Sequence, residues 1–102
     1  PPPSGPAVDP TTLTIAANAT AFDKTELSAP ANSPITIEFD NREALPHNIK
    51  IFKDAFNGET VYDGKIVTGP TKETYDVGPL AAGTYPFVCI VHSNMTGTLT
   101  VQ

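Results

Sequence analysis

The clearest chemical signature in this 102-residue chain is a group of three metal-ligand side chains near its C-terminus. Cys89 is the only cysteine and Met95 the only methionine, and His92 lies between them in the spacing C-x2-H-x2-M. A thiolate, an imidazole and a thioether suit copper better than the hard cations, which prefer oxygen ligands. The spacing therefore predicts a copper-binding loop.

A second imidazole would complete a His2Cys trigonal site with a weak axial methionine, the ligand composition of an electron-transfer copper site. His47, in the segment LPHNI, is the only other histidine of the chain. Pro46 stiffens the backbone before it, because proline fixes its own φ and restricts the preceding Leu45. His47 is therefore the candidate for the fourth ligand.

Each candidate ligand also has an ordinary structural interpretation. A lone cysteine on an inward strand face is commonly a small buried hydrophobic residue, and a lone methionine commonly fills a core. A histidine at a strand end, such as His47, commonly makes only hydrogen bonds. The company of His92 favours the metal interpretation for Cys89, and the polar neighbours Ser93 and Asn94 favour it for Met95.

The net charge and the composition of the chain exclude some classes of binding partner. The net charge of −5 and the pI of about 4.7 argue against nucleic acid, because neutralising phosphates requires clustered Lys and Arg. The six basic residues are scattered: Lys24, Arg42, Lys50, Lys53, Lys65 and Lys72. An acidic surface favours encounter with a basic or neutral partner. The single cysteine excludes an internal disulfide, so the fold must depend on its core or on a metal.

No apolar run reaches the ~18 residues of a membrane span, and no signal-peptide core is present. Residues 1–10, PPPSGPAVDP, predict a Pro-rich linker or a ragged N-terminus ahead of one domain over residues 11–102. Because the chain opens on proline, we interpret it as a processed piece whose upstream part carried an export signal or an anchor. We therefore expect an extracytoplasmic location, either periplasmic or membrane-tethered on the outer face.

Most of the domain carries β-strand signals. Alternating apolar and polar residues predict four strands before residue 80: Thr12–Ala17, Pro34–Asp40, His47–Lys53 and Lys72–Val77. Near the C-terminus, Tyr85, Phe87 and Cys89 share one strand face, and Leu99 and Val101 share a face of the last strand. About seven or eight strands separated by turns in one small domain predict an all-β, Greek-key β-sandwich. The immunoglobulin variant is disfavoured, because the chain has no tryptophan and no cysteine pair.

Three stretches allow more than one structure. Phe22–Leu27 fits a strand or an irregular connection, Thr60–Val67 is ambiguous, and a single helical turn between residues 53 and 60 is an option. Pro86 cannot donate to a ladder, which predicts an edge position or a local break in its strand.

The pattern PHN, followed by G-x-Y-x-F-x-C-x2-H-x2-M-x-G-x-L-x-V, resembles the cupredoxins, the small type 1 blue-copper proteins. The resemblance covers most of residues 11–102, and the ligand spacing is closest to amicyanin-like rather than plastocyanin-like members. It implies a cupredoxin-like sandwich and one copper ion, cycling between Cu(I) and Cu(II), on His47, Cys89, His92 and Met95. It also implies that His92 lies at the surface and that Asn48 ties the two ligand loops together.

Two residues depart from the family pattern. Relatives usually carry Ser or Thr directly after the cysteine, where it can bond the asparagine side chain, and this chain has Ile90 there. Asn48 must therefore find another partner. Ser93 replaces a familiar proline after the second histidine, which predicts a less rigid ligand loop.

These features predict a one-electron carrier rather than an enzyme. It would act as a monomer and dock transiently on redox partner proteins near His92, through an apolar collar of Leu45, Pro46, Ile90 and Val91. The alternative is a copper carrier or sensor on the same fold that does not shuttle electrons. A Cys–His nucleophile is disfavoured for lack of a third orienting residue. A metal-free structural or adhesion module is disfavoured too, because the register of four such ligands would then be a coincidence.

Overall fold

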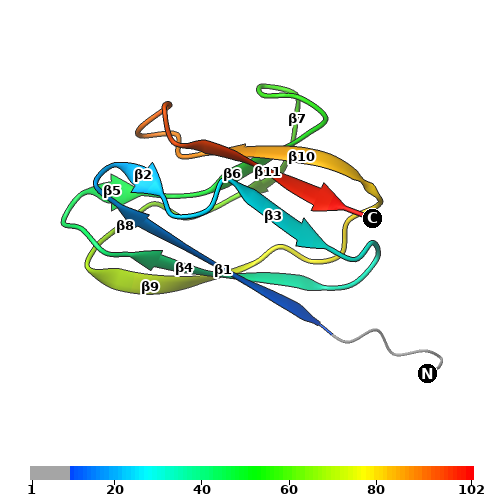
Figure 1. The fold of residues 1–102 in the computed structure, drawn as a ribbon, viewed down its shortest axis with the longest axis horizontal. Helices are drawn as coiled ribbons and strands as arrows, with labels where there is room; N and C mark the ends of the chain where they lie inside the picture. Colours follow the sequence, from blue (N-terminus) through cyan, green and yellow to red (C-terminus); the bar gives the residue numbers. More distant parts are fainter. Residues whose placement is uncertain (1–9) are drawn as a thin grey trace.

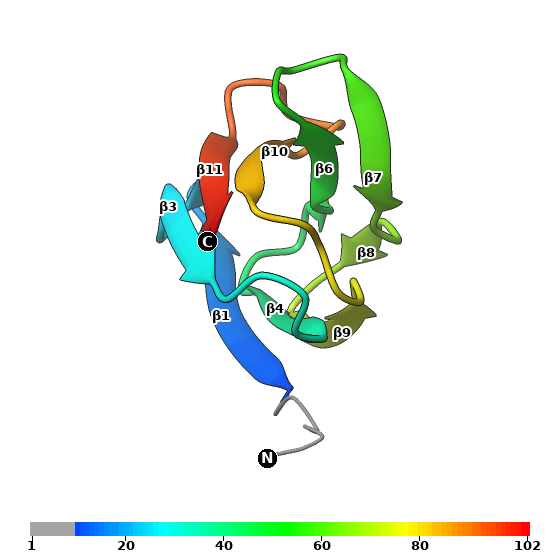
Figure 2. The same cartoon turned by 90° about the vertical axis from the view of Figure 1, so that its right-hand side faces the viewer.

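The computed structural model describes residues 10–102, whose strands form a two-layered β-sandwich (Figure 1, Figure 2). Eight strands in the described part are longer than two residues, in agreement with the seven or eight that the sequence predicts. The strands are β1 (Thr11–Asn18), β2 (Ala21–Phe22), β3 (Glu26–Ala29), β4 (Ile35–Asn41), β5 (Pro46–His47), β6 (Lys50–Lys53), β7 (Glu59–Asp63), β8 (Val67–Thr68), β9 (Thr71–Asp76), β10 (Gly83–Val88) and β11 (Thr96–Val101).

The strand order within each layer follows a crossed-over topology. One sheet has the order β2-β1-β4-β9, the other β3-β11-β10-β6-β7, and β5 pairs with β8 in a separate two-stranded sheet. β1 runs parallel to β4 and β3 parallel to β11, while the other pairs are antiparallel. Chain-adjacent strands such as β3 and β4 therefore lie in different layers, and the predicted all-β sandwich is confirmed.

The core lies between the two main sheets, where aromatic side chains pack among a larger number of aliphatic ones. Phe22 packs edge-on against Phe39 of its own sheet and Phe87 of the other, with ring centroids 6.4 and 5.5 Å apart. Tyr75 of β9 stacks on Phe39 at 5.7 Å and meets Tyr62 of the opposite sheet at 5.6 Å. Such pairs add directional packing energy to the burial of apolar area. The layers are thereby held in a fixed register, which the site requires.

The structure differs in detail from several of the predicted segments. The predicted strand His47–Lys53 is interrupted, so that His47 ends β5 and Lys50 begins β6. The ambiguous segments Phe22–Leu27 and Thr60–Val67 each contain parts of two short strands. Residues 54–58 form bends and turns, and no helix occurs among residues 10–102. The option of a helical turn was therefore wrong.

Pro86 shows how the sheet accommodates a residue without an N–H. The predicted edge position of Pro86 is wrong, because its strand β10 lies between β11 and β6. The pairing of β10 with β6, however, covers only Phe87 and Val88, whereas its pairing with β11 runs the full length of the strand. The ladder to β6 thus breaks at Pro86, which is the other predicted arrangement.

The predicted linker over residues 1–10 lies, except for Pro10, outside the described residues. Within residues 10–102 no helix has the length and hydrophobicity needed to span a membrane.

Candidate metal centre

The loop that carries three of the predicted ligands is the connection between β10 and β11. Val88 and Thr96, at its two ends, are paired directly across the antiparallel ladder. Inside the loop, the His92 N–H donates to the Cys89 carbonyl at 3.2 Å, and the Met95 N–H donates to the His92 carbonyl at 2.9 Å. The C-x2-H-x2-M spacing is therefore two successive i to i+3 turns that share His92.

A third hydrogen bond closes this loop on itself. The Cys89 N–H donates to the Met95 carbonyl at 3.0 Å. The backbone of the loop therefore satisfies its own polar groups at both ends, which fixes the directions in which the three side chains leave it. Cys89, His92 and Met95 are brought to one end of the sandwich, where the β4–β5 loop also arrives (Figure 1).

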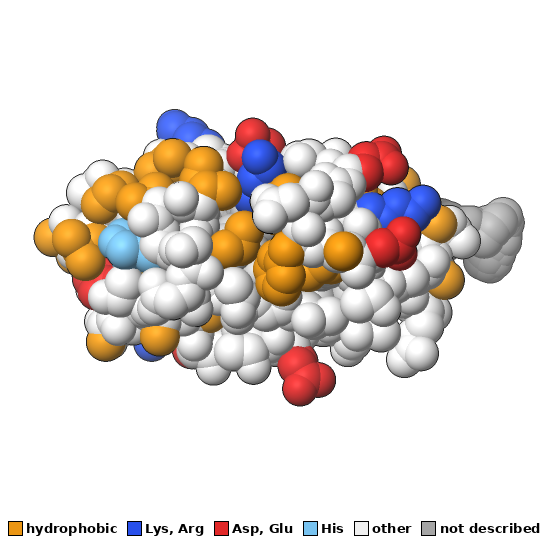
Figure 3. Space-filling model, turned by 90° about the horizontal axis from the view of Figure 1, so that it is seen from above, with side chains coloured by type: hydrophobic (Ala, Val, Ile, Leu, Met, Phe, Trp, Pro, Cys, Tyr) orange, Lys and Arg blue, Asp and Glu red, His pale blue; other side chains and the backbone are white. Residues whose placement is uncertain are grey.

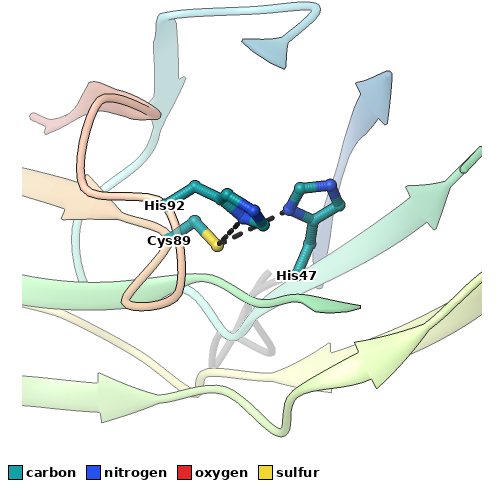
Figure 4. A group of neighbouring side chains, drawn as sticks. All are labelled: His47, Cys89 and His92. Atoms are coloured by element: carbon teal, nitrogen blue, oxygen red, sulfur yellow. Dashed lines mark hydrogen bonds between the residues drawn. The ribbon is translucent and has the colours of Figure 1, made fainter. Parts of the chain in front are cut away.

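The structure brings His47, Cys89 and His92 together although 42 residues separate His47 from Cys89. Figure 4 shows both imidazoles directed toward the Cys89 sulfur. The His47 Nδ1 lies 3.7 Å and the His92 Nδ1 4.0 Å from Sγ, and the two rings are 4.7 Å apart between centroids. All three donor atoms lie within 4.8 Å of one another.

These separations fit a shared metal ion. A first-row metal such as zinc bonds imidazole nitrogen at about 2.0–2.1 Å and thiolate sulfur at about 2.3 Å. With about 120° between two such bonds, sulfur and nitrogen lie about 3.8 Å apart. The observed 3.7 and 4.0 Å lie on either side of this value, so the three donors suit a trigonal centre.

Met95 lies in the same buried cluster as Cys89. Its side chain is 2% exposed and Cys89 is fully buried, despite the polar neighbours of Met95 in the sequence. Met95 therefore packs as a core residue at the base of the loop. Both structural interpretations of this methionine, core filler and weak ligand, are compatible with its position.

His92 is the predicted ligand with an exposed edge. Because His47 is fully buried, the histidine atoms visible at one end of the surface in Figure 3 belong to His92, and hydrophobic side chains lie around them. Leu45, Ile90 and Val91 are 42, 48 and 41% exposed. The predicted apolar residues are thus available at the surface of the metal-binding end.

Asn48 joins the two ligand-bearing loops by a route that does not need a hydroxyl after the cysteine. Its side-chain Oδ1 accepts a hydrogen bond from the backbone N–H of Ile90 at 3.0 Å, and its Nδ2 donates to the Gly64 carbonyl at 2.9 Å. The Asn48 side chain is fully buried; its bond to Gly64 is buried as well, and its bond to Ile90 is partly buried. The absence of Ser or Thr at position 90 therefore leaves the connection intact.

Glu43 is the site residue that the sequence analysis missed. Its Oε1 lies 2.6 Å from His47 Nε2, on the side of the ring opposite Cys89, and accepts a hydrogen bond from the Thr20 N–H at 2.9 Å. These hydrogen bonds, first that from Thr20 and then that with His47, lower the pKa of Glu43 below its ordinary value. The signal in the sequence was an acidic residue four positions before a candidate ligand histidine.

The arrangement Cys89–His47–Glu43 has the residue types of a nucleophile, a base and an orienting acid, which the sequence analysis did not expect. Burial argues against such chemistry, because a nucleophilic thiol has to reach its substrate. Cys89 and His47 are both 0% exposed. A buried cysteine sulfur held between two imidazoles is suited to a metal instead.

Comparison with known proteins agrees with this geometry. Residues 3–101 match the Cupredoxin-like domain family. Sulfocyanin from Sulfolobus acidocaldarius is 32% identical over 91 residues, which cover 71% of this chain and 46% of that protein. Amicyanin-alpha from Methylorubrum extorquens is 35% identical over 81 residues, covering 79% of this chain and 64% of that protein. The chain thus spans about half to two thirds of the length of these relatives.

The fold has close counterparts among solved structures. Auracyanin A, a "blue" copper protein from Chloroflexus aurantiacus, superimposes with a TM-score of 0.82 at 25% identity, over 91% of this chain and 99% of that one. Family match, relatives and fold agree with the strand pattern and with the clustered donors. This chain belongs to the cupredoxin family.

Proposed function

We propose that this protein is a mononuclear type 1 copper protein that carries single electrons between redox partners. The observation that carries the proposal is the convergence of two imidazole nitrogens on one buried thiol at 3.7 and 4.0 Å. Sulfur and nitrogen donors in a trigonal arrangement are typical of blue-copper electron-transfer sites. When bound, copper supplies one-electron chemistry by alternating between Cu(I) and Cu(II).

The residues have distinct roles in this proposal. His47 and His92 would bind copper through Nδ1, Cys89 through its thiolate and Met95 through its thioether. Burial of Cys89 excludes water from the sulfur, and Asn48 keeps the two loops at a constant separation. A ligand set that does not move suits both oxidation states, which keeps electron transfer fast. We expect no substrate turnover.

Electrons would enter and leave through the exposed edge of His92. The exposed apolar side chains of Leu45, Ile90 and Val91 offer a small apolar surface of the kind that supports weak, short-lived complexes. The partner would be a redox protein that docks transiently on the monomer there. We also propose an extracytoplasmic location, because the single thiol is fully buried and so protected from oxidation.

The visible spectrum of the Cu(II)-loaded protein tests the proposal. A His2Cys site predicts an intense thiolate-to-copper charge-transfer band at one copper per chain, which Cys89→Ser abolishes. Absence of that band from the wild-type protein would overturn the copper assignment. Rapid, reversible one-electron reduction supports the electron carrier, whereas a coloured protein that exchanges copper but not electrons would support the carrier or sensor alternative.

A further inference from the structure

The hydrogen bonds of Glu43 connect the metal centre to a distant part of the fold. A single oxygen, Oε1, faces both His47 Nε2 at 2.6 Å and the Thr20 N–H at 2.9 Å. An ionised carboxylate can only accept hydrogen bonds, so Nε2 carries the hydrogen that Glu43 accepts, while Nδ1 of His47 faces the Cys89 sulfur. The Glu43 side chain is only 17% exposed, so water competes weakly for these hydrogen bonds.

The Thr20 N–H belongs to a strained turn. β1 and β2 pair through Ala17–Phe22 and Asn18–Ala21, which leaves Ala19 and Thr20 as a two-residue hairpin turn. Both are left-handed, with φ of 53° and 57°. Asn-Gly and similar pairs usually occupy such turns, and a β-branched residue with positive φ is a genuine outlier. Strain that persists in a small domain is a pointer to a functional requirement.

A second anchor holds the backbone of Glu43. Asn41 is fully buried, and its Oδ1 accepts a hydrogen bond from the Glu43 N–H at 3.1 Å. Its Nδ2 donates to the carbonyls of Leu45 and Val67 at 2.8 and 3.0 Å. The β4–β5 loop is thus fixed at both ends of the segment that places Glu43 beside His47.

We propose that Glu43 is a positioning residue for the ligand His47, and that the Ala19–Thr20 turn is an outer part of the metal centre that holds Glu43 in place. This inference rests on the proposed copper function. A carboxylate that accepts the Nε2–H fixes the tautomer and ring orientation of His47 and raises its basicity toward the metal. A more basic imidazole stabilises Cu(II) over Cu(I), so the arrangement lowers the reduction potential.

Two substitutions of Glu43 distinguish the effect of its oxygen's location from the effect of its charge. Glu43→Asp keeps the charge but withdraws the oxygen by one methylene, about 1.5 Å, and so loses both hydrogen bonds. Glu43→Gln keeps an oxygen that can accept both hydrogen bonds but removes the charge. Asp76→Asn is the matched charge control, because Asp76 pairs with Thr36 at the opposite end of β4 from Asn41.

The turn has its own pair of variants. Thr20→Pro removes the N–H and cannot adopt a positive φ, whereas Thr20→Gly keeps the N–H and favours this conformation. We expect Thr20→Pro to act in the same direction as Glu43→Asp, and Thr20→Gly, which keeps the hydrogen bond to Glu43, to have a smaller effect than Thr20→Pro. Phe22 of β2 packs between the two sheets, so Thr20→Pro also weakens the core, and Glu43→Asp carries the comparison if Thr20→Pro does not fold.

The first measurement uses the metal-free protein, in which NMR detects the His47 Nε2–H and its exchange with water. We expect a protected proton in the wild-type protein, Glu43→Gln and Thr20→Gly, and a rapidly exchanging one in Glu43→Asp. Equal protection in wild type and Glu43→Asp would overturn the inference. If the wild-type protein fails to bind copper, the proposed function fails while this readout still reports the hydrogen bond.

The second measurement is the reduction potential of the copper-loaded variants. Outer hydrogen-bond partners typically change metal affinity 10–100-fold. We expect Glu43→Asp to reduce the preference for Cu(II) over Cu(I) about tenfold, an upward shift of about 59 mV for one electron. Glu43→Gln should shift the potential by less and in the same direction. A potential in Glu43→Asp or Thr20→Pro equal to that of Asp76→Asn would refute the positioning role.

Discussion

Replacing Asn48 by alanine should destabilise the protein, because its buried amide is the direct connection between the two ligand-bearing loops. The substitution leaves the Gly64 carbonyl and the Ile90 N–H without partners. A buried group deprived of its hydrogen bond costs about 1–3 kcal/mol. The Ile90 N–H lies beside an exposed side chain and belongs at the lower end, so we expect a loss of about 2–4 kcal/mol from a typical total of about 5–15 kcal/mol.

Urea denaturation of the metal-free protein measures this loss as a lower midpoint at an unchanged m-value. Asn94→Ala is the matched control, since Asn94 is an exposed asparagine in the β10–β11 loop and should change stability by less than about 0.5 kcal/mol. If Asn48→Ala and Asn94→Ala have equal midpoints, the amide does not join the loops energetically, and the reasoning from its hydrogen bonds is refuted.

Two further predictions concern the packing of the sheets and its pH dependence. Gly97→Ala should destabilise the protein by about 1–3 kcal/mol or more, because the added Cβ would lie 2.3 Å from Phe87 Cζ. Gly83→Ala is the control: its Cβ would meet only ordinary contacts at 3.6 Å or more, and the substitution should be nearly neutral. Equal melting temperatures of the two variants would contradict this prediction. Burial raises the pKa of Tyr75 above its ordinary 10.0. Above about pH 10 the unfolded chain therefore loses a proton that the folded protein keeps, so stability falls as pH rises. Tyr75→Phe should lose the bond to the Lys65 carbonyl, about 1 kcal/mol near neutral pH, and show a flatter alkaline profile in thermal unfolding; an unchanged profile would contradict the role of Tyr75.

Local alternation predicted most of the strands because one face of each is buried. Ile35, Ile37 and Phe39 are all at most 1% exposed, as their period-2 spacing indicates. The interruption between His47 and Lys50 escaped prediction, because Asn48 and Ile49 continue an alternating pattern but are both buried. Asn48 is held there by loop contacts from far along the chain, which local sequence does not encode.

The site was predictable to the extent that its residues are chemically unusual. Cys89, His92 and His47 are rare residue types in this chain, and their ligand chemistry identified them before any geometry was available. Glu43 escaped because it is one of 11 acidic residues, and only the three-dimensional arrangement distinguishes it. Its partner Thr20 contributes a backbone N–H, for which no side-chain pattern exists.

The ligand loop makes its own backbone hydrogen bonds. The fold of the sandwich and the properties of the metal site can therefore change independently of each other. The loop is connected to the sandwich through the paired residues Val88 and Thr96, and its three internal backbone bonds are made within residues 89–95. Changes in the second turn, between His92 and Met95, therefore alter the approach of the thioether without requiring a new strand register. The scaffold can remain constant while the length of one turn adjusts the metal chemistry.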